Sequence, residues 1–142
     1  MKPWLFVLCL SFFLGHELDA VSQAEWRLLY GFRDLPPHLA ERWFVLLHVP
    51  LLAIVLGLCW CRHRATRKYS RRLLASFTLL HAGLHYHLRD HPLNSFDSLS
   101  SQALIGGSAL WGTLYGLYCI RTSRIPPRTT APGLPQETFR DL

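Results

Sequence analysis

The chain has 142 residues, of which 50% are hydrophobic and 17% are charged, and its formal net charge is +6. This composition is too apolar for a typical soluble domain of this size. The basic residues lie beside long apolar segments, so we interpret the positive charge as a signal of membrane orientation and expect no nucleic-acid partner.

The first apolar segment, "PWLFVLCLSFFLGH", predicts either a retained helix over about residues 3–20 or a cleaved secretory signal. Lys2 and the apolar stretch that follows it fit a signal peptide. The cleavage site "LDA" is poor, because Leu18 is bulky and because Glu17 and Asp19 are charged. We therefore favour a retained helix and keep cleavage near Val21 as the alternative.

Two uncharged runs, residues 43–61 and 99–120, predict membrane-spanning helices, since each has about the ~20 residues that cross a ~30 Å hydrocarbon layer. Residues 72–88 are expected to form a shorter helix that carries histidines. Residues 121–142 are rich in proline and threonine and predict a disordered cytoplasmic tail. Together these segments predict an all-α fold, a four-helix transmembrane bundle within residues 1–120.

The lysines and arginines predict how this bundle is oriented. Eleven of the 15 belong to one side of the membrane: Lys2, six residues between the second and third helices, and four after the fourth helix. Because basic residues accumulate on the cytoplasmic side, we expect a multi-pass protein of the cell membrane with both termini in the cytoplasm.

Small residues recur along the fourth predicted helix at Ser108, Gly112 and Gly116. This spacing lets a neighbouring helix approach closely. We expect that helix to belong to the same chain, and a helix of a second copy is the alternative.

Four histidines occur within "LLHAGLHYHLRDHP", residues 79–92. His81 and His85 share a helix face, whereas His87 points elsewhere. Counting along the helices from their charged ends places His48, His81 and His85 about 6–12 Å below the outer surface. Ionisable side chains inside a membrane are costly and usually face a bundle interior or water. The cluster therefore needs a chemical reason.

Three interpretations of the cluster stay open. In the first, imidazoles bind a divalent metal such as zinc, and an acid adds a ligand or activates water; the predicted ligands are His16, His48, His81 and His85, and the predicted catalytic acids are Glu17 and Asp19. In the second, neutral histidines form only hydrogen bonds between helices. In the third, haem takes one axial histidine from each of two helices, such as His48 with His81 or His85.

The motifs "LGHELDA", "AEWRLL", "LLHVPLL", "LHAGLHYHL" and "FDSLSSQALIGGSALWG" occur in this order over about residues 5–118. In this order they resemble a family of small bacterial membrane proteins of unknown function, with four hydrophobic segments and a His-Glu-x-Asp motif in the first. The resemblance implies a retained first helix and no particular activity. The residues to which it draws attention are His16, Glu17, Asp19, His48, His81 and His85.

Two functional hypotheses follow. The first is metal-assisted hydrolysis of a lipid or other outer-leaflet substrate at the His/carboxylate cluster. The second is a non-catalytic membrane subunit whose polar network is structural or docks a partner, either another membrane protein or a second copy. Both place the chain in the lipid bilayer.

Overall fold

The computed structural model describes residues 3–123, which form four α-helices and one short 3-10 helix. The elements are α1 (Pro3–Ser22), η1 (Glu25–Leu28), α2 (Pro37–Trp60), α3 (Arg64–His87) and α4 (Leu99–Ser123). The predicted all-α class is confirmed for this part of the chain. Most of the predicted disordered tail lies outside the described residues, and residues 121–123 belong to the end of α4.

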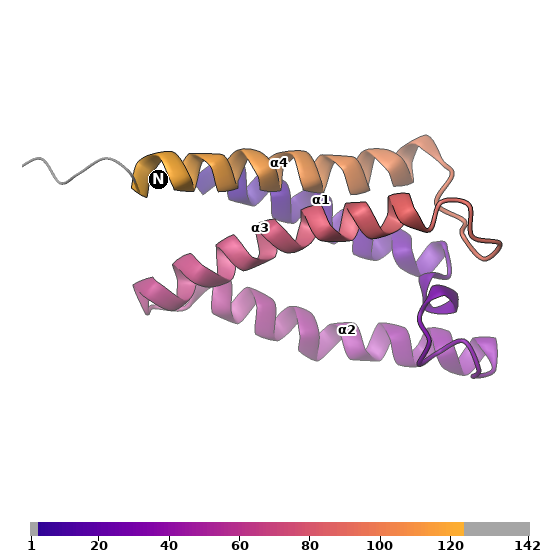
Figure 1. The fold of residues 1–142 in the computed structure, drawn as a ribbon. Coiled ribbons are helices and arrows are strands. Elements are labelled where there is room, and N and C mark those ends of the chain that lie inside the picture. Colours follow the sequence, from indigo (N-terminus) through magenta and orange to yellow (C-terminus); the bar gives the residue numbers. More distant parts are fainter. Residues whose placement is uncertain (1–2, 124–142) are drawn as a thin grey trace, which may run out of the picture.

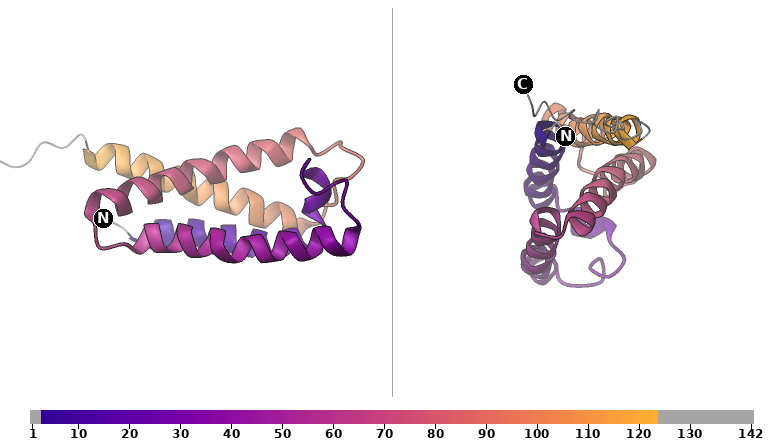
Figure 2. Two further views of the ribbon diagram at one scale, coloured as in Figure 1. Left: turned by 90° about the horizontal axis from the view of Figure 1, so that it is seen from below. Right: turned by 90° about the vertical axis from the view of Figure 1, so that its left-hand side faces the viewer.

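The four helices run alternately up and down the bundle (Figure 1). α1 begins and α4 ends at the same end, as four antiparallel helices require (Figure 2). α4 packs against α1 and α3, whereas α2 packs mainly against α3. α2 and α3 lie close together near the turn that connects them and diverge toward the other end, where η1 lies (Figure 1).

Both α2 and α3 begin earlier than the apolar runs that predicted them. α2 begins at Pro37 rather than near residue 43. Proline is favoured in the first turn of a helix, because its missing N–H group would have no acceptor there in any case. α3 begins at Arg64 rather than near residue 72, and the ring of His63 caps this helix by accepting a hydrogen bond from the Thr66 backbone N–H at 3.3 Å. The first turns of α3 are therefore polar.

The turn between α2 and α3 lies at one end of the bundle, which we call the arginine end after Arg67, Arg71 and Arg72. There Arg67 donates to the Cys61 carbonyl at 3.0 Å, and Arg71 donates to the Cys59 carbonyl at 2.9 Å. Cations stabilise the free carbonyl groups at a helix C-terminus. These bonds therefore tie the start of α3 to the end of α2.

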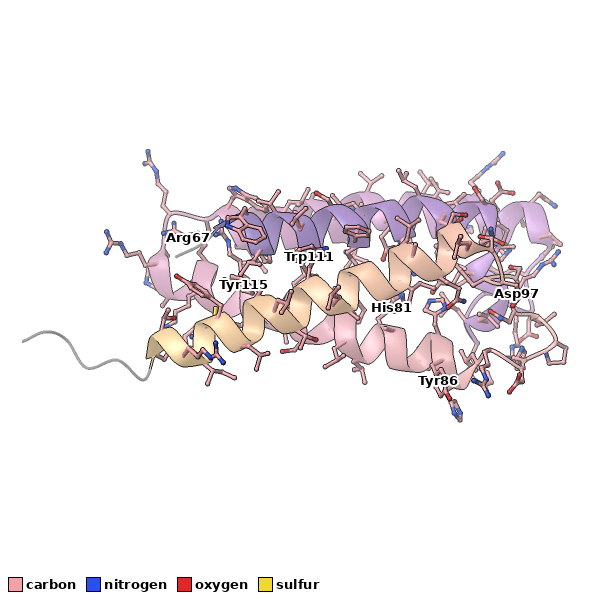
Figure 3. All side chains as sticks on the ribbon, turned by 90° about the horizontal axis from the view of Figure 1, so that it is seen from above. Arg67, His81, Tyr86, Asp97, Trp111 and Tyr115 are labelled. Atoms are coloured by element: carbon pink, nitrogen blue, oxygen red, sulfur yellow. The ribbon has the colours of Figure 1, made fainter. Side chains whose placement is uncertain are left out.

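The opposite end is called the histidine end after three residues, His16, His81 and His85. Each end has its own buried apolar cluster. The cluster at the arginine end includes Phe6 and Tyr115, and the one at the histidine end includes Trp26 and Phe96. Figure 3 shows Arg67 and Tyr115 toward one end and Asp97 at the other, with His81 between them. The histidines thus lie next to the buried apolar cluster that includes Trp26 and Phe96.

A glycine of α4 lets α3 approach closely. A Cβ atom at Gly112 would lie 2.5 Å from Oγ1 of Thr78 and 2.8 Å from the backbone oxygen of Ala75. The predicted packing within the chain is therefore confirmed at Gly112. A Cβ atom at Gly116 would meet no atom within 4 Å in the described part of the chain, so this residue makes no such close approach.

Three helices, α1, α2 and α4, are long and apolar enough to cross a membrane. Only 11% of the most apolar stretch of α2 is buried within the protein, so the rest of its apolar surface needs lipid or another partner. α3 is not among the three, because basic residues fill its first turns and histidines occupy its last. The chain thus has the character of a membrane protein, with three rather than four helices of spanning composition.

Candidate metal centre

Four side chains from three elements meet at the histidine end. His16 comes from α1, Glu25 from η1, and His81 and His85 from consecutive turns of α3. One possible ligand atom of each lies within 4.8 Å of the others. His16 and His85 are buried, and the other two are half-buried. Three imidazoles and one carboxylate therefore surround a single point.

The imidazoles meet through their Nε2 atoms. Nε2 of His81 lies 2.8 Å from Nε2 of His16 and 3.2 Å from Nε2 of His85. The Nε2 atoms of His16 and His85 each lie 3.7 Å from an oxygen of Glu25. Ligand atoms at about 2.0–2.1 Å from a tetrahedral zinc ion are about 3.3 Å apart. The two N···N distances and the two N···O distances, which involve different oxygens of Glu25, are thus of the size found between ligands of one metal ion.

Hydrogen bonds alone leave this cluster incompletely satisfied. A neutral ring nitrogen either donates one proton or accepts one. Nε2 of His81 can therefore form one well-directed bond, with His16 or with His85, and the second short N···N contact cannot be another one. A cation, by contrast, accepts an electron pair from all three nitrogens at once. The nitrogen geometry favours a shared cation over a network of hydrogen bonds.

Aromatic rings enclose the imidazoles. The Phe96 ring, from the connection between α3 and α4, has its centroid 4.5 Å from that of His85 and 5.5 Å from that of His16. The Phe77 ring stacks on His81 at a centroid distance of 5.4 Å. An apolar shell around a metal site limits the access of solvent and lowers the local dielectric constant. These rings therefore cover His16, His85 and one face of His81, whereas Glu25 and His81 stay half-buried.

Glu25 is the candidate ligand that the sequence analysis missed. Ala24 adopts a left-handed backbone conformation, with φ 54° and ψ 45°, which residues other than glycine rarely take. This residue turns the chain after α1 and begins η1, so that the carboxylate of Glu25 faces His16 and His85. The motif "AEWRLL" gave no signal for this, because the turn at Ala24 and not the spacing from the histidines places Glu25.

The carboxyl group of Glu25 is difficult to ionise where it stands. Burial raises the pKa of Glu25 to about 7; the neighbouring Glu17 carboxylate adds to this effect, and His48 opposes it. An ionised Glu25 therefore needs a nearby positive charge, and a bound divalent cation would supply it.

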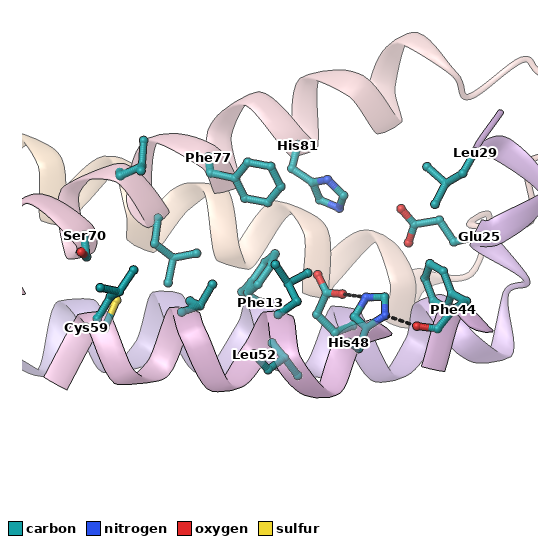
Figure 4. Close-up of a pocket in the computed structure, with 16 residues that line it drawn as sticks. Phe13, Glu25, Leu29, Phe44, His48, Leu52, Cys59, Ser70, Phe77 and His81 are labelled. Atoms are coloured by element: carbon teal, nitrogen blue, oxygen red, sulfur yellow. Dashed lines mark hydrogen bonds and ion pairs between the residues drawn. The ribbon is translucent and has the colours of Figure 1, made fainter. Parts of the chain in front are cut away.

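Glu17 and His48 form a separate pair, and both line the same cavity as Glu25 and His81. Figure 4 shows His48 with its two interactions as dashed lines. Nδ1 of His48 lies 2.6 Å from the Phe44 carbonyl oxygen, and its Nε2 lies 2.8 Å from Oε2 of Glu17. Because a carbonyl oxygen only accepts, Nδ1 must carry a proton and donate it. The contact between Nε2 and Oε2 then requires another proton, held on the imidazole or on the carboxyl group. The pair therefore stores one exchangeable proton.

Three of the four predicted ligands, His16, His81 and His85, come together in the structure. The fourth, His48, contacts Glu17 and is not part of the cluster. His48, which we considered as a haem ligand with His81 or His85, bonds through its two ring nitrogens to the Phe44 carbonyl and to Glu17.

The remaining residues that the sequence singled out lie apart from the cluster. Oδ1 of Asp19 accepts a long hydrogen bond from the Gln23 amide at 3.4 Å, and Asp19 is not one of the four convergent groups. His87 is exposed at the end of α3. Glu17 rather than Asp19 is thus the acid of the first helix that lies beside the cluster.

The fold and the cluster define a small helical protein of membrane-spanning composition with a shielded histidine–glutamate site. The sequence matches the family model described as "Family of unknown function (DUF6713)" over residues 2–122, and the chain belongs to this family. The expected membership of an uncharacterised family is thereby confirmed. No curated protein and no solved structure matches the chain.

Proposed function

We propose that this protein binds one divalent metal ion, such as zinc, at the histidine end and hydrolyses a lipid or other outer-leaflet substrate there. The observation that carries the proposal is the convergence of three Nε2 atoms and one carboxylate on a single point. Nitrogen and oxygen ligands in this ratio suit zinc and other first-row divalent ions, whereas magnesium and calcium prefer oxygen alone.

The proposal includes a membrane orientation. We place the chain in the cell membrane with α1, α2 and α4 spanning it and with the less apolar α3 crossing in contact with all three. Both termini are then in the cytoplasm and the histidine end is at the outer face. The asymmetry of the basic residues supports this orientation. Reporter fusions test it: fusions after Lys68 and after Leu142 should report cytoplasm, and one after His38 should report the exterior. A cytoplasmic signal at His38 contradicts the orientation.

The roles of the side chains follow from their contacts. His16, His81 and His85 would hold the metal ion, and Glu25 would be a fourth ligand that gives up its place to a water or substrate oxygen, because a catalytic zinc ion keeps one position open. When bound, the ion would polarise a substrate carbonyl and make water easier to ionise. Glu17 accepts a proton from the attacking water through the oxygen that does not face His48. The water oxygen bonds to the carbonyl carbon, the ester C–O bond breaks, and Glu17 returns the proton to the leaving alkoxide.

His48 acts through Glu17 and is a positioning residue. Its bond to the Phe44 carbonyl fixes the imidazole, and its Nε2 in turn holds one oxygen of Glu17. In the His-Glu-x-Asp motif, His16 is then the ligand and Glu17 is the proton acceptor. We expect bacterial members of the family to share these two roles.

Lipid-ester hydrolysis by the protein purified in mild detergent tests the proposed activity. A fluorogenic long-chain ester should be cleaved by the metal-loaded protein, lose its turnover after treatment with a chelator, and regain it when zinc is added. Turnover that survives complete removal of metal contradicts the proposal. A stoichiometric metal without turnover contradicts hydrolysis and favours a non-catalytic membrane subunit.

A further inference from the structure

A cavity of about 540 Å³ lies next to the histidine cluster, with walls from α1, η1, α2 and α3 (Figure 4). Its volume falls within the range of about 300–1,000 Å³ that is usual for small-molecule sites. It shares Glu25 and His81 with the cluster. Any occupant of the cavity therefore reaches the candidate metal centre.

The polarity of the cavity changes along its length. Its carboxylates and imidazoles, from Glu17, Glu25, His48 and His81, are confined to the histidine end. Figure 4 shows Glu25, His48 and His81 at one end of the cavity, and Cys59 and Ser70 at the other. Leucine, valine and phenylalanine side chains form nearly all of the wall between. The cavity thus complements a molecule with one polar end and a long apolar remainder.

The apolar part of the cavity is about as long as one leaflet of a bilayer is thick. On α2 the lining extends from Phe44 to Cys59, and its part between the imidazole-bearing His48 and Cys59 is roughly 16 Å at about 1.5 Å per residue. Half of a hydrocarbon layer about 30 Å thick is roughly 15 Å. A single acyl chain of the leaflet at the histidine end would therefore run from the polar groups to the inner end of the cavity.

The cavity is open to the side. Leu51 of α2 and Leu73 of α3 both line it, yet their exposed fractions are 54% and 73%. In a membrane these residues face the hydrocarbon layer, so a chain can enter laterally without crossing water. A peptide would place unsatisfied backbone groups against this wall, and an ionic ligand would lose its hydration there.

We propose that this cavity binds one acyl chain of a lipid of the outer leaflet and holds the ester group of that chain at Glu25 and His81. The inference deepens the function proposed above and depends on it for the chemistry at the polar end. Lipid tails are as apolar as the cavity wall, so burial of the chain gives little preference over the bilayer. The polar end therefore selects and orients the lipid, and the apolar wall sets the length of the chain.

Photolabelling in vesicles tests the binding. The probe is a phosphatidylcholine with a diazirine at the middle of one acyl chain, incorporated into phosphatidylcholine vesicles that contain the full-length protein. Labelled residues are mapped by mass spectrometry. We expect labels on cavity residues such as Leu52, Val55 and Leu74 in addition to the lipid-facing surface.

Two tryptophan variants provide the comparison. Leu51→Trp fills the side opening, whereas Leu46→Trp changes a residue of the same type and similar exposure, 50% against 54%, that does not line the cavity. We expect Leu51→Trp to lose the labels at Leu52, Val55 and Leu74 and Leu46→Trp to keep them. Labels confined to the lipid-facing surface overturn the inference, as do equal losses in the two variants or crosslinks to a second copy at Leu51.

Metal-loaded and chelator-treated samples are labelled in parallel, so that the two proposals can fail separately. If the protein never binds metal but its cavity residues are labelled, the metal centre is refuted and the acyl-chain site is supported. Stoichiometric metal and ester hydrolysis without cavity labels retain the proposed function and refute the acyl-chain site.

Discussion

The two ends of the bundle satisfy their polar side chains in different ways. At the arginine end, cationic donors face backbone acceptors: besides the bonds of Arg67 and Arg71 to α2, Arg72 donates to the Ser123 hydroxyl at 3.0 Å and to the Cys119 carbonyl of α4 at 3.4 Å. Donor meets acceptor in each of these contacts. These bonds need no additional ligand, although Nε of Arg72 and the Tyr115 hydroxyl are buried without a partner among the described residues.

At the histidine end, groups of the same kind face one another. Three Nε2 atoms converge, and the carboxylate beside them is difficult to ionise in a buried position. The protein has placed these side chains where a cation or extra protons must complete their interactions. The difference indicates that the arginine side chains hold helices together, whereas the groups at the histidine end leave interactions that a bound cation would complete.

The largest expected effect concerns the proton-bearing pair at the histidine end. Glu17→Gln should reduce ester hydrolysis by about 10²–10⁴-fold, the usual contribution of a general base, because an amide does not accept the water proton. The metal content should not change. Asp19→Asn is the matched control from the same helix and should retain most of the activity. Steady-state rates and metal analysis on the same samples check this, and equal losses of activity reject the role of Glu17.

The metal affinity should depend on pH because the ligands must be free of protons. With its pKa raised to about 7, Glu25 is increasingly protonated as the pH falls below that value, and metal must then displace the proton. Affinity should therefore fall below about pH 7, by about tenfold per pH unit for each proton displaced.

Titration of the metal at several pH values measures this dependence. Glu25→Gln should bind more weakly and show a shallower pH dependence, whereas Glu41→Gln, at an exposed position of α2, should behave as wild type. An unchanged pH profile in Glu25→Gln would show that Glu25 is not a ligand.

A packing pair tests the part of the bundle between the two ends. Gly112→Ala should lower stability by about 1–3 kcal/mol, because its new methyl group would overlap the Ala75 carbonyl oxygen. Gly116→Ala has open space and should keep or slightly raise stability, since alanine favours a helix over glycine by about 1 kcal/mol. Thermal unfolding in detergent should separate the two variants, and equal midpoints would contradict the tight α3–α4 contact.

The smallest expected effect lies at the arginine end. Arg71→Gln removes the bond to the Cys59 carbonyl and should cost about 1 kcal/mol, with no change in metal content. Arg64→Gln, at an exposed residue in the first turn of the same helix, is the control and should be nearly neutral. Loss of metal in Arg71→Gln would contradict the account in which the arginine end contributes to stability and not to metal binding.

The sequence predicted those parts of the fold and site that depend on local spacing. Two apolar runs of membrane-spanning length and a shorter apolar first segment indicated three of the helices, and the four-residue spacing of His81 and His85 placed both on one face. His16 was predicted as a ligand from its position at the end of the first helix. These features follow from helix geometry within one segment or from length alone.

The rest depended on contacts that no local pattern contains. Glu25 belongs to the cluster because the backbone turns at Ala24. His48 does not belong to it, because its two ring nitrogens contact Glu17 and the Phe44 carbonyl. The start of α3 was misplaced for a related reason, since apolar content marked the membrane segment and not the polar turns before it. The residues of the cluster and the start of α3 therefore depend on turns and on contacts between helices, which the sequence pattern does not contain.

The most direct test of the central claim is the metal content of purified wild-type protein beside two histidine variants. His81→Ala removes the central nitrogen of the cluster, whereas His87→Ala removes an exposed imidazole of the same helix. The cluster predicts about one metal ion per chain in wild type and in His87→Ala, and loss of metal in His81→Ala. Absence of metal from the wild type, or equal metal content in both variants, would contradict a metal centre at the histidine end.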